Sequence, residues 1–354
     1  MILISKTYWS GMPFFYKGPL PEGTQVEPVM LKSDDWRDIT GLYYKPAVKQ
    51  QKVAVLVMHP KVDFTRHYCI PPFVGAGIAS LGLTTRCLNN YTMAIHEDLI
   101  LDVNAGVKFL RQQGYDKVVL FGNSGGGALS AFFQAQAQRP KGRRLTHTPA
   151  GDPTKLNRAD MVPADALITV SAHRGEGHVL MSSIDASVVD ERDPTQTDSA
   201  LDMYNPANGF APPPLPSHYA ADFVQRYRAA QRARVAKLDA IARSMVEESR
   251  HYDKAYAEAP ESMDFAARHR LGRLGALERI MVIYRTMANL NYTDPHLEPS
   301  LRGYGSLLSE RPDLMNFQST GFARILRPEA WLSTWSALSS HACTETHLSE
   351  IENI

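Results

Sequence analysis

The chain has 354 residues, of which 44% are hydrophobic and 21% charged, and its 38 basic and 37 acidic residues give a formal net charge of +1. This is the balance of an ordinary soluble globular protein, and it excludes the domain-wide basic field that attracts nucleic acid or anionic membranes. Three scattered cysteines, Cys69, Cys87 and Cys343, form no C-x-x-C pair, which argues against a disulfide framework or a zinc site and favours the reducing cytoplasm.

The start of the chain predicts strands rather than a targeting segment. The first residues, MILISKTYWS, lack the pattern of a signal peptide, and no apolar run approaches 18 residues, so we expect no membrane span. Residues 26–35 and 38–46 read as an antiparallel pair of strands. The run 52–60, KVAVLVMHP, is apolar and β-branched without polar alternation, which is typical of a strand buried on both faces.

The next segments alternate between helix and strand. After a candidate strand that begins at Leu83, residues 94–113 place their apolar side chains on one helical face. Residues 117–122, KVVLFG, predict a second buried strand, which is followed by a helix that Pro140 must end, and then by a strand over 165–173. This alternation predicts an α/β fold with a mostly parallel sheet and helices on both faces.

The character of the chain changes in its second half. The stretch 218–290 is rich in Ala, Arg and Glu with helical spacing throughout, and the motif RIMVIYR continues this pattern. We therefore predict an α/β core over residues 1–204, a helical insertion over 205–327, and a return to the core over 328–354. The basic run 226–234 is followed closely by acidic residues, which indicates a solvated helix face.

A serine flanked by glycines follows the second buried strand. Residues 122–126 read GNSGG, so Ser124 stands between Gly122 and Gly126 in a G-x-S-x-G string. Catalytic and binding residues of such sheets lie at the carboxyl ends of the strands, and the sequence places His59, Ser124 and His173 there. A tight strand-to-helix turn would raise the serine hydroxyl above the sheet and aim the N–H groups of the helix start at a developing oxyanion.

This segment resembles the nucleophile elbow of the α/β-hydrolase superfamily, and the resemblance extends over residues 53–173. The motifs DFTRHY and NNYTMAIHEDLILDV are similar to an uncharacterised group of that superfamily, and the helical insertion corresponds to a cap. The resemblance implies that Ser124 is the nucleophile and that Gly125 donates one oxyanion N–H. The motif MHP is similar to the His-Gly of the oxyanion loop, which implies Lys61 as the second donor and a loop-shaping role for His59. The chain departs from the pattern at Pro60, which has no N–H.

The acid and histidine that complete the catalytic triad are not evident. In the superfamily they follow later strands, and after residue 173 no convincing buried strand remains. One interpretation is a truncated or alternative form that lacks both groups, and another is that a different histidine, such as His173, serves as the base. A third is an unconventional triad, with its acid and base drawn from Asp185, Asp190 or Glu191 and from His341 or His347.

We therefore expect an enzyme that hydrolyses an acyl bond, most simply a carboxylic ester, through an acyl-enzyme on Ser124. The large cap indicates a small-molecule acyl substrate that is bulky and apolar. C–C bond hydrolysis, thioester cleavage and acyl transfer use the same nucleophile. The alternative is a non-catalytic ligand-binding or interaction protein on the same scaffold. This mechanism requires no metal or organic cofactor. His173 and His178 are five positions apart, but no third ligand stands near them in the sequence, which argues against a metal site. The sequence is compatible with a homo-oligomer.

Overall fold

The computed structural model describes residues 14–48, 52–88, 90–298, 311–317 and 321–352. The described residues form two compact units. One, which we call the sheet unit, contains those of residues 14–179 and 340–352. The other, which we call the helical unit, contains those of residues 180–339 and therefore begins earlier and ends later than the insertion predicted over 205–327.

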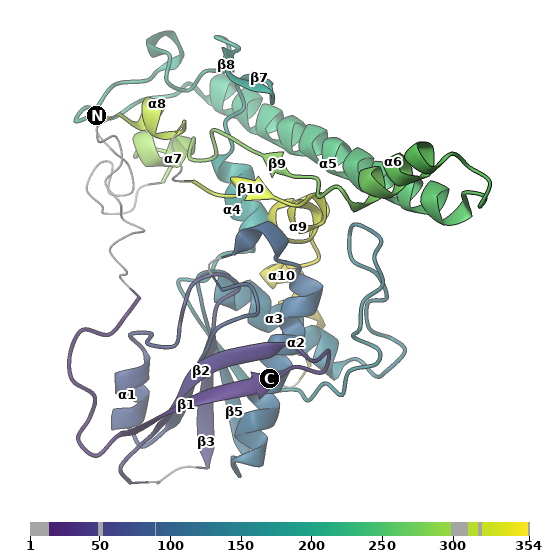
Figure 1. The fold of residues 1–354 in the computed structure, drawn as a ribbon. Helices are drawn as coiled ribbons and strands as arrows, with labels where there is room; N and C mark the ends of the chain where they lie inside the picture. The colour runs from purple at the N-terminus through teal and green to yellow at the C-terminus, as the bar shows by residue number, and fades with distance from the viewer. Residues whose placement is uncertain (1–13, 49–51, 89, 299–310, 318–320, 353–354) are drawn as a thin grey trace. The chain divides into compact units, whose positions relative to one another are not determined.

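A six-stranded sheet organises the sheet unit (Figure 1). The strand order is β1-β2-β4-β3-β5-β6, and β1 and β2 are antiparallel to their neighbours while β4, β3, β5 and β6 run parallel. The predicted α/β fold with a mostly parallel sheet is thereby confirmed. The strands are β1 (Gln25–Lys32), β2 (Asp38–Lys45), β3 (Val53–Met58), β4 (Ala79–Leu83), β5 (Lys117–Asn123) and β6 (Ala166–Val170).

Helices cover both faces of this sheet. On one face lie α2 and α3, with α10 packed on α3, and on the other lies α1 (Figure 1). The helices of the unit are α1 (Ile70–Gly75), the short 3-10 helix η2 (Tyr91–Met93), α2 (His96–Gln112), α3 (Gly125–Gln138) and α10 (Thr344–Glu350), while α4 (Glu176–Ser183) follows β6.

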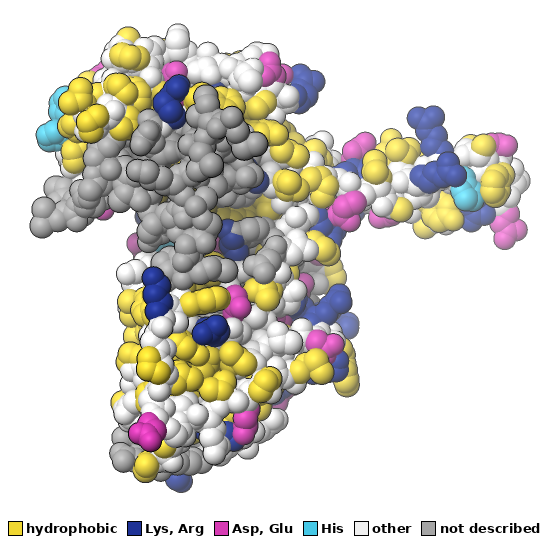
Figure 2. Space-filling view, turned by 60° about the vertical axis from the view of Figure 1, so that its left-hand side comes forward, with side chains coloured by type: hydrophobic (Ala, Val, Ile, Leu, Met, Phe, Trp, Pro, Cys, Tyr) yellow, Lys and Arg dark blue, Asp and Glu magenta, His cyan; other side chains and the backbone are white. Residues whose placement is uncertain are grey.

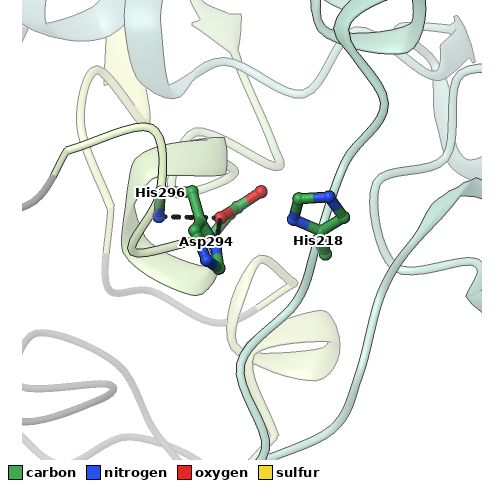
Figure 3. Close-up of side chains that lie close together, drawn as sticks. All are labelled: His218, Asp294 and His296. Carbon is green, nitrogen blue, oxygen red and sulfur yellow. Dashed lines mark hydrogen bonds and ion pairs between the residues drawn. The ribbon is translucent and has the colours of Figure 1, made fainter.

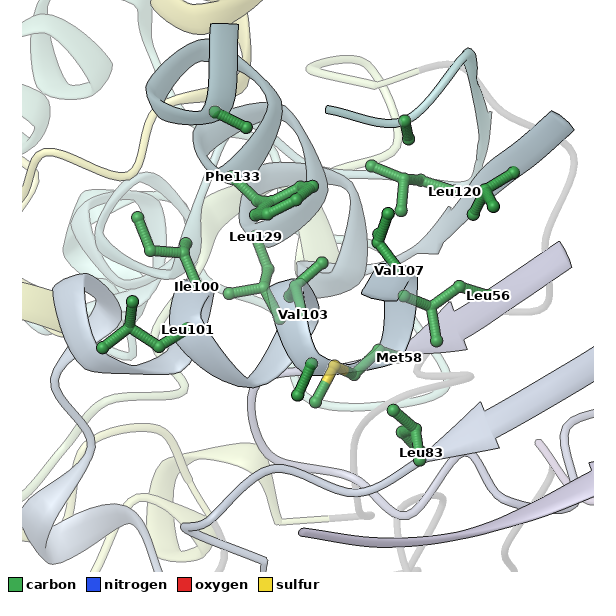
Figure 4. Packing of buried hydrophobic residues seen from close by; sticks show 14 of the residues in the cluster. Leu56, Met58, Leu83, Ile100, Leu101, Val103, Val107, Leu120, Leu129 and Phe133 are labelled. Atoms are coloured by element: carbon green, nitrogen blue, oxygen red, sulfur yellow. The ribbon is translucent and has the colours of Figure 1, made fainter. Parts of the chain in front are cut away.

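The two faces are built by alternation along the buried strands. In β3, Leu56 and Met58 point towards α2 and α3, whereas Val55 and Val57 belong to the cluster that packs on α1. Figure 4 shows the first cluster, in which the apolar stripe of α2 meets that of α3. Burial of each such side chain contributes about 1.5–3 kcal/mol, which explains why the uninterrupted apolar runs of the sequence become central strands.

A buried ion network fixes the loops beside the sheet. The Arg86 guanidinium donates to the carboxylate of Asp35, with Nη1–Oδ2 at 2.6 Å, and to that of Asp102, with Nε–Oδ1 at 2.8 Å. Burial opposes ionisation, but hydrogen bonds from Arg86 and Ser33 hold the pKa of Asp35 below its ordinary value. The network joins the β1–β2 turn to α2.

The helical unit is dominated by one long helix, α5 (Ala221–Glu258), which packs against α6 (Phe265–Ala276). Its smaller elements are β7 (Val188–Asp190), β8 (Asp193–Thr197), η3 (Pro206–Asn208), β9 (Met281–Val282), α7 (Leu290–Thr293), α8 (Pro312–Met315), β10 (Ile325–Leu326), α9 (Pro328–Ala330) and the π-helix η4 (Trp331–Trp335). The helical prediction for RIMVIYR was wrong: this segment is not helical, because β9 within it pairs antiparallel with β10.

The described surface and helices carry two further observations. On the face shown in Figure 2, basic and acidic side chains are interspersed, in keeping with the net charge of +1. Across the part of the chain that the structure describes, no helix combines the length and apolar character needed to cross a membrane.

Candidate active site

Ser124 occupies a strained turn between a strand and a helix. β5 ends at Asn123 and α3 begins at Gly125, so a single residue joins them. Its dihedral angles are φ 53° and ψ −126°, a conformation that residues with a side chain rarely adopt. Such strain persists only where the surrounding structure imposes it, and it is a feature of functional sites. Ser124 is partly exposed, although the residues on both sides of it are buried.

The glycines around the serine are required by close approach. A Cβ on Gly122 would lie 2.5 Å from the Cα of Gly127, so that the end of β5 and the first turn of α3 leave no room for a side chain. A Cβ on Gly126 would collide with the carbonyl oxygen of Met58. The G-x-S-x-G spacing therefore reflects the contact of the helix start with two strands.

The start of α3 presents N–H groups at this turn. No side chain caps the helix, and the N–H groups of a first helical turn have no acceptor within their own helix. Gly125, the predicted oxyanion donor, is the first of these residues. The helix dipole adds partial positive charge at the same place, which favours a negatively charged ligand atom there.

A buried carboxylate lies over Gly125. A Cβ on Gly125 would collide with Oε1 of Glu176, the first residue of α4, and Glu176 is only 6% exposed. Its Oε2 lies 3.4 Å from Nε2 of His96, at the start of α2, and neither carboxylate oxygen has a hydrogen-bond partner among the described residues. Burial lowers the pKa of Lys61 to about 8, although the Glu176 carboxylate opposes this shift.

His59 shapes the loop after β3. Its Nδ1 accepts hydrogen bonds from the backbone N–H groups of Lys61 and Val62, both at 3.0 Å, so the ring proton is held on Nε2. Burial first, and then the neighbouring His173 and Lys61, hold the pKa of His59 well below its ordinary value. His59 is thus a neutral donor, and the Lys61 N–H assigned by resemblance to the oxyanion already has an acceptor. The Nε2 of His59 lies 3.1 Å from the Cβ position of Gly125.

An imidazole–carboxylate pair stands in the same unit. Nδ1 of His341 lies 2.9 Å from Oε1 of Glu97, whose side chain is fully buried in the first turn of α2. The His341 side chain is 33% exposed. A histidine that is held at Nδ1 by a buried carboxylate keeps a fixed orientation and leaves Nε2 as the proton-accepting atom.

The other sequence candidates have different surroundings. The Nδ1 of His173 accepts from the N–H of Gly175 at 3.2 Å. The His347 ring stacks on Phe132, with centroids 4.7 Å apart, and burial lowers its pKa. The three candidate acids lie in the helical unit, each paired with an arginine: Asp185 with Arg285, Asp190 with Arg192 and Glu191 with Arg234.

The sequence analysis did not single out three polar residues that the structure places near the serine turn or beside the candidate base: His96, Glu97 and Glu176. Glu97 and His96 stand at the start of the helix predicted over 94–113, and Glu176 follows the strand predicted over 165–173. Both places are helix starts that follow strands of the sheet, and polar residues there are candidates for a site at the carboxyl edge of the sheet. The sequence therefore contained a signal for these residues. The pairing of Glu97 with His341 spans 244 positions and has no local signature.

No protein-family model matches the chain, and no curated protein matches it. Part of it is similar to a hypothetical protein from Pseudomonas aeruginosa, at 13% identity and a TM-score of 0.33 over 47% of this chain and 48% of that chain. An inhibited esterase B from Lactobacillus rhamnosis aligns at 16% identity and a TM-score of 0.33 over 47% and 54% of the two chains. An esterase from Pyrococcus furiosus aligns at 17% identity and a TM-score of 0.29 over 35% and 52%. The chain thus spans about half the length of these neighbours. The activities named for them describe those proteins and are not assigned to this chain.

Proposed function

We propose that the chain is a serine hydrolase that cleaves an acyl bond, most simply a carboxylic ester, through an acyl-enzyme on Ser124. The observation that carries the proposal is the conformation of Ser124, with φ at 53° and ψ at −126° between the end of β5 and the start of α3. This strain is explained by a role for the raised hydroxyl, because a structural serine at a strand–helix turn gains nothing from it.

The oxyanion of the tetrahedral intermediate is assigned to two donors near the helix start. The N–H of Gly125 is the first, as the resemblance implied. For the second, Nε2–H of His59 replaces the N–H of Lys61, because the latter is donated to Nδ1 of the same ring. A neutral imidazole fixed in this tautomer stabilises a developing negative charge without any change in its own protonation.

The base of the proposed reaction is His341, held by Glu97. Nε2 of His341 takes the proton of the Ser124 hydroxyl as Oγ bonds to the substrate carbonyl carbon, and Glu97 stabilises the imidazolium. The imidazolium then gives this proton to the leaving alkoxide as the ester C–O bond breaks. Water, deprotonated by the same imidazole, then attacks the acyl carbon, and the imidazolium returns this proton to Oγ as the acyl C–Oγ bond breaks, which releases the carboxylic acid and restores the Ser124 hydroxyl. His341 was one of three histidines, with His347 and His173, that the sequence offered for this role, and its hydrogen bond to Glu97 is what favours it.

The proposal is tested by hydrolysis of p-nitrophenyl acetate and butyrate. We expect Ser124→Ala and His341→Ala each to lower kcat by at least about 10³-fold, and the double variant to be no slower than either, because residues that act as a unit lose activity non-additively. Glu97→Gln should have a smaller effect of the same kind. His251→Ala, which removes an exposed imidazole of α5, is the matched control. Independent, multiplicative effects of the two substitutions would contradict the shared mechanism.

A second candidate, a ligand-binding protein without catalysis, is favoured by Glu176. Its carboxylate lies so near to Gly125 that it opposes negative charge on a bound carbonyl oxygen. In that case the folded wild type would hydrolyse neither ester faster than Ser124→Ala does. If Glu176 only attenuates catalysis, Glu176→Gln should hydrolyse both esters faster than the wild type.

A further inference from the structure

The helical unit contains three metal-ligating side chains that the proposed reaction does not use. His218 lies just before α5, and Asp294 and His296 lie just after α7. One ligand atom from each side chain lies within 4.8 Å of the other two (Figure 3). The two histidines are exposed and the aspartate is buried. We propose that this cluster binds a divalent transition-metal ion of the zinc class, with water at the remaining position.

Backbone hydrogen bonds hold the two segments in place. The residues on either side of His218 are both fixed to the other segment: the N–H of Ser217 donates to the carbonyl of Thr293 at 2.9 Å, and the N–H of Tyr219 donates to Oδ2 of Asp294 at 2.9 Å. His218 itself donates its N–H to the carbonyl of Gly209 at 2.9 Å. The ligand positions are therefore set by the fold before any ion arrives, as an efficient metal site requires.

The side chains are already close to the arrangement that an ion needs. Nδ1 of His296 lies 3.1 Å from Oδ1 of Asp294, and the rings of His218 and His296 meet edge to face with centroids 5.0 Å apart. Ligand atoms about 2.1 Å from a tetrahedral zinc ion lie about 3.4 Å from each other. The two imidazoles are exposed, so their rings can turn towards an ion, whereas the buried carboxylate of Asp294 is fixed.

The chemistry of the set selects the class of ion. Two imidazoles and one carboxylate are ligands that suit zinc and its neighbours, whereas calcium and magnesium take oxygen ligands almost alone. The hydrogen bond from the His296 N–H to Oδ1 of Asp294, at 2.9 Å, fixes the local turn, and the bond from the Tyr219 N–H to Oδ2 holds His218, 76 positions earlier in the chain, beside the same carboxylate. The exposed imidazoles leave one side of the cluster open to water, as three-ligand zinc sites do.

The test uses the full-length chain freed of metal by dialysis against a chelator. Zn²⁺ is titrated by calorimetry, and Co²⁺ is added to read its visible d–d absorption, which is intense only in tetrahedral sites. His218→Ala and His296→Ala are compared with His251→Ala and His269→Ala, which remove exposed histidines of the same unit. We expect one ion per chain, tetrahedral Co²⁺ absorption, and affinity at least tenfold weaker in the first two variants but unchanged in the controls.

Two results overturn the proposal: wild-type binding no tighter than that of His218→Ala and His296→Ala, or an equal loss in all four variants. The melting temperature supplies an independent readout, since an ion that binds only the folded state raises it. Zn²⁺ should raise the melting temperature of the wild type and of both controls, and should leave that of His218→Ala and His296→Ala unchanged. Neither measurement depends on ester hydrolysis, so failure of the metal site is distinguishable from failure of the proposed enzyme.

Discussion

Gly122→Ala tests whether the serine turn is as tight as the structure indicates. The added Cβ would lie 2.5 Å from the Cα of Gly127 and 2.7 Å from its backbone nitrogen. Carbon atoms in contact normally stand about 3.5–4.0 Å apart, so the end of β5 and the first turn of α3 would have to separate by roughly 1 Å. Overpacking typically costs about 1–3 kcal/mol. We expect the upper end, near 3 kcal/mol, because both partners are backbone and neither can rotate away.

Urea denaturation followed by circular dichroism measures this loss in the free energy of unfolding. A loss of about 3 kcal/mol corresponds to a melting temperature lowered by roughly 6–12 °C in a domain of this size. The control is Gly18→Ala, where a Cβ would meet no atom within 4 Å, and its stability should stay within about 0.5 kcal/mol of the wild type. Equal unfolding midpoints for Gly122→Ala and Gly18→Ala would refute the close strand–helix contact.

Two further predictions concern buried charges. Burial lowers the pKa of Lys61 to about 8 from its ordinary 10.5, so between these values the unfolded chain binds more protons and stability rises with pH. The free energy of unfolding of the wild type should therefore increase relative to that of Lys61→Met between about pH 8 and 10. A difference between the two proteins that stays constant over this range would contradict the shift. Arg86→Met removes the guanidinium from the buried carboxylate of Asp102 and leaves Asp35 with its ion pair to Lys155. The loss should lower the free energy of unfolding by about 3–5 kcal/mol, whereas Arg192→Met at the surface should leave the urea midpoint unchanged. Equal urea midpoints for the two variants would show that the network contributes nothing.

The sequence predicts the sheet and the serine turn well because both leave local signals. Central strands carry uninterrupted apolar runs, 53–58 in β3 and 118–121 in β5, and the strand–glycine–serine–glycine order indicates the turn directly. The helical prediction for 279–285 failed because β9 is only two residues long and depends on a partner strand 44 positions away. A pattern read within one segment cannot reveal a distant partner.

The polar groups of the site are harder to predict for the same reason. Glu97 and His341, and likewise His218 and Asp294, are brought together by the fold and have no characteristic spacing. Glu176 becomes a candidate site residue only in the structure, where its Oε1 occupies the space that a Cβ on Gly125 would need. The candidate nucleophile Ser124 could therefore be proposed from the sequence, whereas its proposed base, its proposed second oxyanion donor and the proposed metal ligands required the structure.

The most direct measurement of the central proposal is the site of reaction with a fluorophosphonate. The folded wild type should gain one phosphonyl adduct, located by mass spectrometry of its peptides on Ser124, and neither Ser124→Ala nor the urea-unfolded chain should be labelled. A folded wild type that stays unmodified, or that carries the adduct on another residue, would contradict the assignment of Ser124 as the nucleophile.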